Sequence, residues 1–439
     1  MVRDQDTQTV KQVAVRRRDQ ILLFVLLSFL LSDVLDGAIR YTLANAGLTS
    51  LVYLPKTLLA LMVVAALAAD LARGRMSAAQ LGALALLAAG VVHGYLVLGN
   101  AVQVAFGLWV LIPFLGGIVA LPALLRALPR VRRYAFFLWA VAVGGVLINV
   151  VHPWPWIGLE YGLGGVAIEG SRLWGTEGLV RLPGFSRASF EAANQILLLA
   201  AVLLVCSRGW RRLLVWLLSG VSIALTTSKT PLLAYLVLTA FCLTHHVLPR
   251  YAWRLVPVGL ATLCVALPLS TLLVSYDFSA ALQDPVPRAL LASLGDRLES
   301  VWPETLAMVV EDGNVVLGRG VGGIGMAHQY FGTAAYSPAD NLGVYLYALF
   351  GILGLGSLVL YGLRLGSLAL RDLISLLTFV TGLILLLSGL SSNVLESPVL
   401  ALVFGANLRY ALSGVLARLF AGPTVRSEHS IPARSTAGA

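Results

Sequence analysis

Residues 342–363 read LGVYLYALFGILGLGSLVLYGL, a run of 22 residues that carries no charged side chain. Because an α-helix needs about 20 apolar residues to cross the hydrocarbon core of a bilayer, this run predicts a membrane-spanning helix. Eleven further apolar runs are centred on 21–39, 51–70, 79–99, 102–122, 134–152, 191–206, 212–227, 231–248, 255–276, 370–389 and 395–414. The sequence therefore predicts an all-α polytopic membrane protein with about 12 transmembrane helices.

The composition of the chain points to the same class of protein. Of its 439 residues, 58% are hydrophobic and only 12% are charged, whereas a soluble domain carries about 25% charged residues. This excludes an ordinary soluble enzyme, a disordered chain and a disulfide scaffold. The net charge of +10 does not indicate a nucleic-acid partner, because Lys and Arg lie in short clusters between apolar runs, as in inner-membrane proteins.

The distribution of basic residues predicts the orientation of the helices. Cytoplasmic loops carry an excess of Lys and Arg, and placing both termini in the cytoplasm puts 22 of the 31 basic residues on that side. The nine others lie on the outer side, at Arg40, Lys56, Arg172, Arg181, Arg187, Lys229, Arg288, Arg297 and Arg319. We therefore expect a multi-pass inner-membrane protein whose functional groups face outward.

Two long loops are predicted on the outer side. The chain divides into a cytoplasmic basic tail (1–20), helices 1–5 (21–152), an outer loop (153–190), helices 6–9 (191–276), a large outer loop (277–341), helices 10–12 (342–414) and a cytoplasmic tail (415–439). The larger loop contains an amphipathic helix from about Pro287 to Val301, which Pro303 should end or kink. Loops of this length are usually functional or disordered, and their aromatic residues argue against disorder.

The first candidate site is the stretch RLPGFSRASFEAANQ at 181–195, where an outer loop meets an apolar run. It brings Arg181, Arg187 and Glu191 to the membrane boundary. Arginines near helix ends also serve as interfacial anchors, so this interpretation stays open. A functional role is favoured because the two arginines lie on the side that basic residues usually avoid.

The second candidate site is the tight outer turn TTSKTP at 226–231. Its hydroxyl groups and Lys229 open a helix, where backbone N–H groups and a positive charge hold anions. The alternative is a helix start capped by a hydroxyl such as that of Ser228. The sequence does not decide between these two interpretations.

The third candidate site runs from Arg297 to Asn341 through the Gly-rich stretch LGRGVGGIG at 317–325. No strand precedes these glycines and no GK[ST] follows, so a nucleotide-binding loop is not favoured. We interpret the glycines as allowing close backbone approach in a tight turn. Further candidates on this segment are Arg319, His328 and Asp340, although an Asp at a helix start is often only an N-cap.

Outward-facing arginines at one membrane boundary have a clear chemical use. Lipid-linked sugar donors of bacteria carry a diphosphate at the membrane surface, and Arg binds phosphate through two-pronged hydrogen bonds. An ionised acid, Asp340 or Glu191, is suited to take the proton from an attacking sugar hydroxyl. No pair of histidines has the spacing of a metal-binding helix, and no cofactor is predicted.

Four features in sequence order resemble the O-antigen polymerase and O-antigen ligase superfamily of bacterial inner membranes. RLPGFSRASFEAAN resembles its R-x-x-G stretch, and TTSKTPLLAYL is similar to its outer turn. DRLESVW resembles its Arg…Trp segment, and GRGVGGIG with the later ADNLGVYLYALFGILGLG resembles its glycine motif, polar pair and span. The ligase branch places a His beside the Asn of that pair, where this chain has Asp340, so the polymerase branch is favoured.

This resemblance implies a GT-C-like helical bundle whose large periplasmic loop contains short helices. It implies a metal-independent glycosyltransferase that polymerises undecaprenyl-diphosphate-linked repeat units into an exopolysaccharide, capsule or O-antigen. By position, Arg181, Arg187 and Arg297 would hold the diphosphate, and Asp340 with Asn341 would orient or deprotonate the acceptor. Membrane lipid, a flippase and a chain-length regulator are the expected partners. A ligase and a polytopic transporter remain the alternatives.

Overall fold

The computed structural model describes residues 17–163, 166–171, 175–176, 179–245, 247, 250–332 and 337–420. Helices account for 76% of the structure and strands for 2%, which confirms the all-α class. Most of the two basic tails predicted at 1–20 and 415–439 lies outside the described residues.

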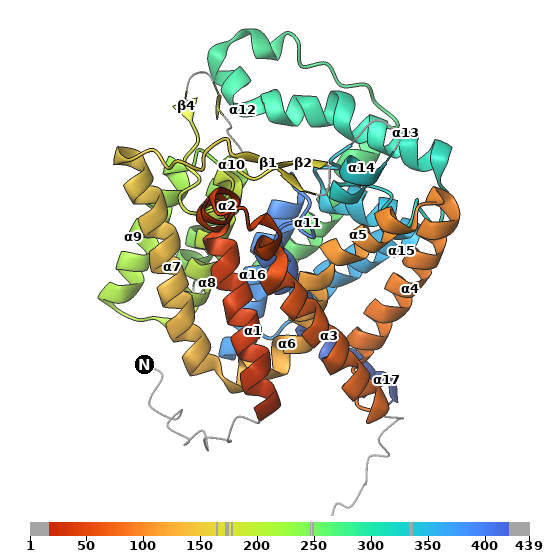
Figure 1. Cartoon of the computed structure of the whole chain (residues 1–439), viewed down its shortest axis with the longest axis horizontal. Coiled ribbons are helices and arrows are strands. Elements are labelled where there is room, and N and C mark those ends of the chain that lie inside the picture. Colours follow the sequence, from red (N-terminus) through yellow and green to blue (C-terminus); the bar gives the residue numbers. More distant parts are fainter. Residues whose placement is uncertain are drawn as a thin grey trace, which may run out of the picture.

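A bundle of long helices forms the body of the molecule, and these helices occupy the apolar runs of the sequence (Figure 1). They are α1 (Arg17–Val34), α3 (Leu54–Ala72), α4 (Ala78–Leu98), α5 (Ala101–Val110), α6 (Ile112–Arg126), α7 (Leu128–Val151), α8 (Ser189–Cys206), α9 (Trp210–Leu225), α10 (Lys229–Thr244), α11 (Arg250–Ser270), α15 (Leu342–Gly366), α16 (Leu373–Gly389) and α17 (Pro398–Phe420). Within the bundle, α17 packs against α6, and α11 packs against α15.

The outer surface of the bundle is apolar, as a bilayer requires. Only 17% of the apolar window of α3 is buried inside the molecule, and leucines such as Leu61 and Leu96 are 64% and 75% exposed. In the described residues, seven helices are long and apolar enough to cross a membrane, or eight if the bent pair α1–α2 forms one span. The fold is therefore that of a multi-pass membrane protein, and the count of 12 spans stays a prediction.

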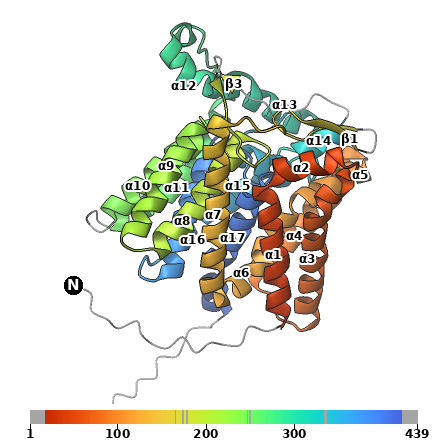
Figure 2. The same ribbon diagram turned by 60° about the vertical axis from the view of Figure 1, so that its left-hand side comes forward.

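Short elements cover one end of the bundle, and we call them the cap (Figure 2). They are α2 (Asp36–Asn45), η1 (Thr49–Tyr53), β1 (Glu160–Leu163), β2 (Val166–Glu169), β3 (Gly175–Thr176), β4 (Leu179–Val180), η2 (Ala281–Gln283), α12 (Pro285–Asp296), η3 (Arg297–Val301), α13 (Trp302–Asp312) and α14 (Met326–Phe331). β1 pairs with β2 and β3 with β4, both antiparallel. The start of α1 and the end of α17 lie at the opposite end of the bundle (Figures 1 and 2).

Two of the predicted elements differ from the structure at their ends. The run 21–39 is not one straight helix: α1 ends at Val34 and α2 turns away from it by 81° to lie in the cap. The amphipathic helix predicted to reach Val301 ends at Asp296 and passes through one π-helical turn into α13. Pro303 opens α13, since a proline in the first turn of a helix costs no hydrogen bond.

The Gly-rich stretch at 317–325 enters the bundle instead of lying on its surface. The N–H of Val321 donates to the carbonyl of Gly90 in α4 at 2.9 Å, and Gln103 of α5 donates its side chain to the carbonyl of Gly322 at 2.8 Å. Gly320 has φ +83°, and a Cβ there would meet the backbone N of Gly94 at 2.2 Å. The interpretation of these glycines as sites of close backbone approach is confirmed.

Candidate functional site

A cavity of about 390 Å³ lies where the cap meets the bundle, and we call it the outer cavity. Its walls come from α1, α3 and α5 of the bundle and from α2, η1, β2 and α14 of the cap. The charged residues that line it are Asp33, Asp36, Arg40, Lys56, Arg187 and Glu396. Such a volume falls within the ordinary range of small-molecule sites, about 300–1,000 Å³.

Two arginines in the cavity wall are held by carboxylates, and we call this group the arginine cluster (Asp36, Arg40, Arg187 and Glu191). Arg40 donates its Nε to both oxygens of Asp36, at 2.9 and 2.8 Å. Arg187 donates its Nη2 to Glu191 Oε1 at 2.8 Å, and its Nε lies 3.9 Å from Asp36 Oδ2. Burial opposes the charge of Arg187, but the carboxylates of Glu191 and Asp36 outweigh it and raise the pKa of Arg187.

The stretch at 181–188 is docked so that Arg187 faces this cavity. The N–H of Gly37 in α2 donates to the carbonyl of Phe185 at 3.0 Å, and Trp156 Nε1 donates to the carbonyl of Gly184 at 3.1 Å. A Cβ at position 37 would lie 2.6 Å from the carbonyl oxygen of Ser186, so only glycine permits this contact. Glu191 follows in the first turn of α8, four residues after Arg187, which is the spacing of a helical ion pair.

Two more charged side chains reach the cavity from within apolar runs. Asp33 of α1 accepts a hydrogen bond from Gln195 Nε2 at 2.8 Å. The ammonium group of Lys56, in the first turn of α3, lies 5.2 Å from the ring centre of Trp109. At that distance a cation is attracted by the face of an aromatic ring.

The cavity continues to a loop that joins α16 to α17. Its Glu396 accepts a hydrogen bond from the N–H of Met326 at 2.7 Å, and this contact docks α14 on the loop. The same loop region meets α15 at Leu390, whose carbonyl accepts from Asn341, and α10 at Ser391, which contacts Thr230. The loop between α16 and α17 therefore contacts the cap ends of α10, α14 and α15.

Arg297 and Asp340, both predicted from the sequence, are brought together across 43 residues of chain. Arg297 Nη2 donates to Asp340 Oδ2 at 2.9 Å, and the Asp340 side chain is 37% exposed. The N-cap of α15 is the neighbouring Asn341, whose side chain accepts from the N–H of Val344. Interpreting Asp340 as a helix cap is therefore wrong, and its carboxylate faces Arg297 instead.

Arg319 and His328 lie apart from both of these groups. Arg319 is buried and donates its Nη1 to the carbonyl of Gly323 at 2.9 Å, with Asp312 Oδ2 at 3.6 Å from Nη2. Burial, with the charge of Arg319, lowers the pKa of His328. These contacts hold the Gly-rich stretch in place, and neither residue lines the outer cavity.

The remaining predicted residues are spread over the cap end of the bundle. Ser228 is the N-cap of α10 but makes no side-chain capping bond, so the capping alternative for this turn is not supported. Lys229 follows it and is exposed. Arg181 is half-buried at the start of the docked stretch. Of the ten residues predicted for the site, Arg187 alone lines the outer cavity.

Sequence reasoning missed most of the cavity. Asp33, Asp36 and Lys56 interrupt apolar runs and were not among the predicted site residues, although an ionisable residue inside a membrane span is a candidate for function by default. Glu396 stands in the polar turn SGLSSNVLESP at 388–398, which carries no motif. Among the described residues, no group of three or more His, Cys, Asp or Glu is arranged to hold a metal ion.

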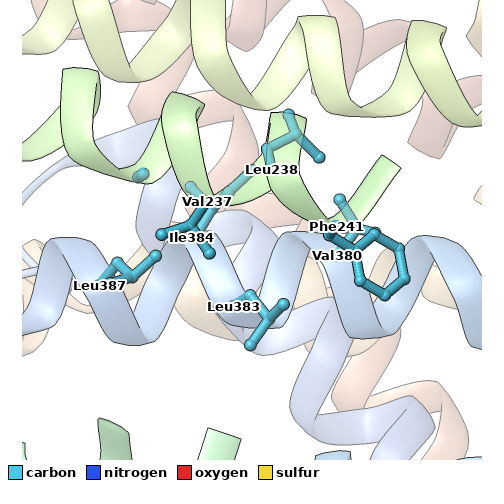
Figure 3. A pocket seen from close by; sticks show the side chains of 8 residues that line it. Val237, Leu238, Phe241, Val380, Leu383, Ile384 and Leu387 are labelled. Atoms are coloured by element: carbon cyan, nitrogen blue, oxygen red, sulfur yellow. The ribbon is translucent and has the colours of Figure 1, made fainter. Parts of the chain in front are cut away.

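A second pocket lies between α10 and α16 and is entirely different (Figure 3). It measures about 10 Å³, about the space of one water molecule. Its lining is Ala234, Val237, Leu238, Phe241, Val380, Leu383, Ile384 and Leu387. This is a packing gap between two apolar helices and offers no group for chemistry.

Comparisons of this chain with protein-family models, with curated proteins and with solved structures found no match.

Proposed function

We propose that this protein is a membrane glycosyltransferase that joins lipid-diphosphate-linked saccharide units at the cap end of its bundle. The observation that carries the proposal is the outer cavity, where cations, carboxylates and aromatic rings meet at the end of an apolar bundle. A lipid-diphosphate-linked saccharide combines matching groups: a lipid chain for the apolar bundle, and hydroxyl-rich rings for the polar and aromatic lining of the cavity.

In the proposed reaction, a sugar hydroxyl of one unit attacks the anomeric carbon of another unit. A glycosidic bond forms, the bond from the anomeric carbon to the diphosphate oxygen breaks, and the lipid diphosphate leaves with the electron pair. The hydroxyl proton passes to a carboxylate, for which Asp340 is the candidate, with Asn341 or Glu191 beside the acceptor. Arg181, Arg187 and Arg297 are the candidates for the charge that develops on the diphosphate.

The proposed setting is the bacterial inner membrane, with the cap in the periplasm and both termini in the cytoplasm. The product would be an exopolysaccharide, a capsule or an O-antigen chain. A flippase that delivers the units and a protein that regulates chain length are the partners such an enzyme needs.

The test is to incubate the purified protein with undecaprenyl-diphosphate-linked repeat units and separate the products. A ladder of lengthened saccharides is expected for the wild type and is lost in Arg297→Ala. Arg288→Ala is the matched control, because Arg288 lies on the same cap segment and its Nε and Nη2 donate to the backbone carbonyls of Leu282 and Gln283. Absence of a ladder with the wild type contradicts the proposal.

A transporter is the second candidate, because the bundle contains interrupted helices. α15 has a non-helical residue at Gly351 with φ 59°, and α1 breaks into α2 at 81°. Broken helices beside charged residues are typical of secondary transporters. Flux of labelled monosaccharides and of protons into proteoliposomes separates the two: transport that Arg297→Ala abolishes would favour a transporter.

A further inference from the structure

The charges that line the outer cavity are balanced. Three cations, Arg40, Lys56 and Arg187, face three carboxylates, Asp33, Asp36 and Glu396. The attraction between a multiply charged anion and these cations is offset by its repulsion from the carboxylates. Both interactions act at short range in a medium of low dielectric constant. A diphosphate is therefore a poor occupant of this cavity.

The two arginines are also committed to neighbours. Arg40 is held by both oxygens of Asp36 and by the hydroxyl of Tyr161, and Arg187 is held by Glu191. A guanidinium group bonded in this way has a fixed position and a neutralised charge. These arginines shape the wall of the cavity and leave a few N–H donors for a ligand.

Lys56 and Asp33 line the same cavity but do not form an ion pair with each other. Among the described residues, Lys56 forms no hydrogen bond or ion pair, and its close contact is the ring of Trp109. Asp33 accepts a hydrogen bond from Gln195 and has no ion pair within the described residues. A ligand that both donates and accepts hydrogen bonds satisfies both groups, and a sugar hydroxyl does this.

Aromatic side chains complete the lining. They are Phe29, Tyr53, Phe106, Trp109, Tyr330 and Phe331. A sugar ring presents hydroxyl groups at its edge and C–H groups on its face, and the C–H face packs on an aromatic ring. Tyr and Trp offer a flat apolar surface with a polar end, which suits a ligand of this mixed character.

We propose that the outer cavity binds the uncharged, hydroxyl-rich saccharide part of the substrate, and that the diphosphate lies outside it. This inference rests on the proposed function and specifies which part of the substrate the cavity takes. It assigns Arg187 to the wall of a saccharide site and removes it from the diphosphate-binding group. Asp33, Lys56 and Trp109 are the groups that contact the saccharide.

The test measures two separate ligands on the purified full-length protein by titration calorimetry. One is the repeat-unit oligosaccharide released from its lipid by mild acid, and the other is undecaprenyl diphosphate without sugar. Asp33→Asn, which loses one hydrogen-bond acceptor, and Trp109→Leu, which loses the flat ring, are each expected to weaken oligosaccharide binding by roughly tenfold. Binding of undecaprenyl diphosphate should not change in either variant.

The controls are matched in chemistry and lie outside the cavity. Asp284→Asn changes an exposed aspartate of the cap, and Trp210→Leu changes an exposed tryptophan of α9. Neither should alter the binding of the oligosaccharide. If Asp33→Asn fails to fold, Trp109→Leu still reports on the cavity, because it removes no charge.

Three outcomes would overturn the inference: no binding of the free oligosaccharide, binding that both variants leave unchanged, or loss of undecaprenyl diphosphate binding in the variants. The product ladder of the wild type is a separate measurement. A ladder without cavity-dependent saccharide binding leaves the proposed function standing and removes the saccharide site. Saccharide binding without a ladder leaves the saccharide site standing and removes the proposed function.

Discussion

Two arginine–carboxylate groups lie at the cap end of the bundle, and they differ in burial. In the arginine cluster, the Glu191 side chain is 4% exposed and the Arg187 side chain 16% exposed. In the second group, the Arg297 side chain is likewise 16% exposed, and its partner Asp340 is 37% exposed. Each group joins a positive charge to a negative charge at about the same distance, 2.8 and 2.9 Å, so the burial of the carboxylate is what distinguishes them.

The pair with the buried carboxylate is a fixed part of the structure, whereas the pair with the partly exposed carboxylate is able to exchange a partner. A buried ion pair cannot lose one partner cheaply, because the remaining charge has no water to solvate it. A pair with a partly exposed carboxylate costs less to break, because water reaches the carboxylate when its partner is lost. Arg297 can therefore exchange its carboxylate for a phosphate at a lower cost than Arg187, because Asp340 is less buried than Glu191.

The largest effect is expected from Glu191→Ala in the arginine cluster. The change leaves Arg187 buried with Asp36 as its nearest carboxylate, at 3.9 Å. Removing one partner of a buried pair costs about 3–5 kcal/mol of unfolding free energy. Unfolding of the purified protein by SDS in mixed micelles measures this loss.

The double variant Arg187→Met with Glu191→Leu sharpens the same comparison. Replacing both partners by apolar residues of similar size removes the unpaired charge and is often close to neutral. Most of the stability lost in Glu191→Ala should therefore return. A double variant as unstable as the single one would mean that the pair positions the 181–188 stretch by more than its charge.

A smaller effect is expected from Asn341→Ala, next to the pair of Arg297 and Asp340. Asn341 caps α15 by accepting from the N–H of Val344 at 3.0 Å, and its amide donates to the carbonyl of Leu390. Loss of an N-cap costs about 1 kcal/mol, which SDS unfolding detects. Asn341→Ser, which keeps a capping oxygen and, like Ala, lacks the amide that reaches Leu390, is the control and should lose less.

The class of fold was predictable because lipid imposes it. Every apolar run of about 20 residues must satisfy its backbone within the segment, so it forms a helix, and each predicted run contains one. The bend between α1 and α2 was less accessible to prediction. It depends on Phe185, whose carbonyl accepts from the N–H of Gly37 across more than 140 residues of sequence.

The candidate site was predictable only where it is local in sequence. The pairing of Arg187 with Glu191 follows from helical spacing, and both residues were identified. The meeting of Arg297 with Asp340 depends on how the cap folds, which no spacing encodes. Lys56 and Glu396 reach the cavity from opposite parts of the chain, and only the packing of α3, α14 and α17 brings them together.

A modest pH dependence is expected from His328, which belongs to neither arginine group. Burial and the charge of Arg319 lower the pKa of His328 below the ordinary value, while Asp312 acts in the opposite direction. Between the lowered value and about 6.5, the unfolded chain binds more protons than the folded one. Stability should therefore fall as the pH drops through about 6.5.

The thermal midpoint of the protein in detergent, followed from about pH 7.5 to about pH 5.5, measures this dependence. In His328→Gln the part of the slope that this histidine causes should disappear. The Arg187→Met with Glu191→Leu variant should keep the slope, because it does not touch the histidine. An unchanged slope in His328→Gln would show that His328 does not titrate differently in the folded and unfolded chains.

The smallest effect on stability, and the sharpest separation of the two regions, is expected from Asp340→Asn. Because the carboxylate is partly exposed and Asn keeps an oxygen that accepts from Arg297, the loss is expected to be about 1 kcal/mol or less, and SDS unfolding should change little. Under the proposed function, the same variant loses the product ladder, because Asp340 accepts the proton of the attacking hydroxyl. A variant that keeps both its stability and its ladder would show that Asp340 takes no part in the reaction. The structural difference between the two pairs would still hold. If stability instead falls as far as in Glu191→Ala, the pair of Arg297 and Asp340 is part of the framework too, and the burial of the carboxylate does not distinguish the two groups.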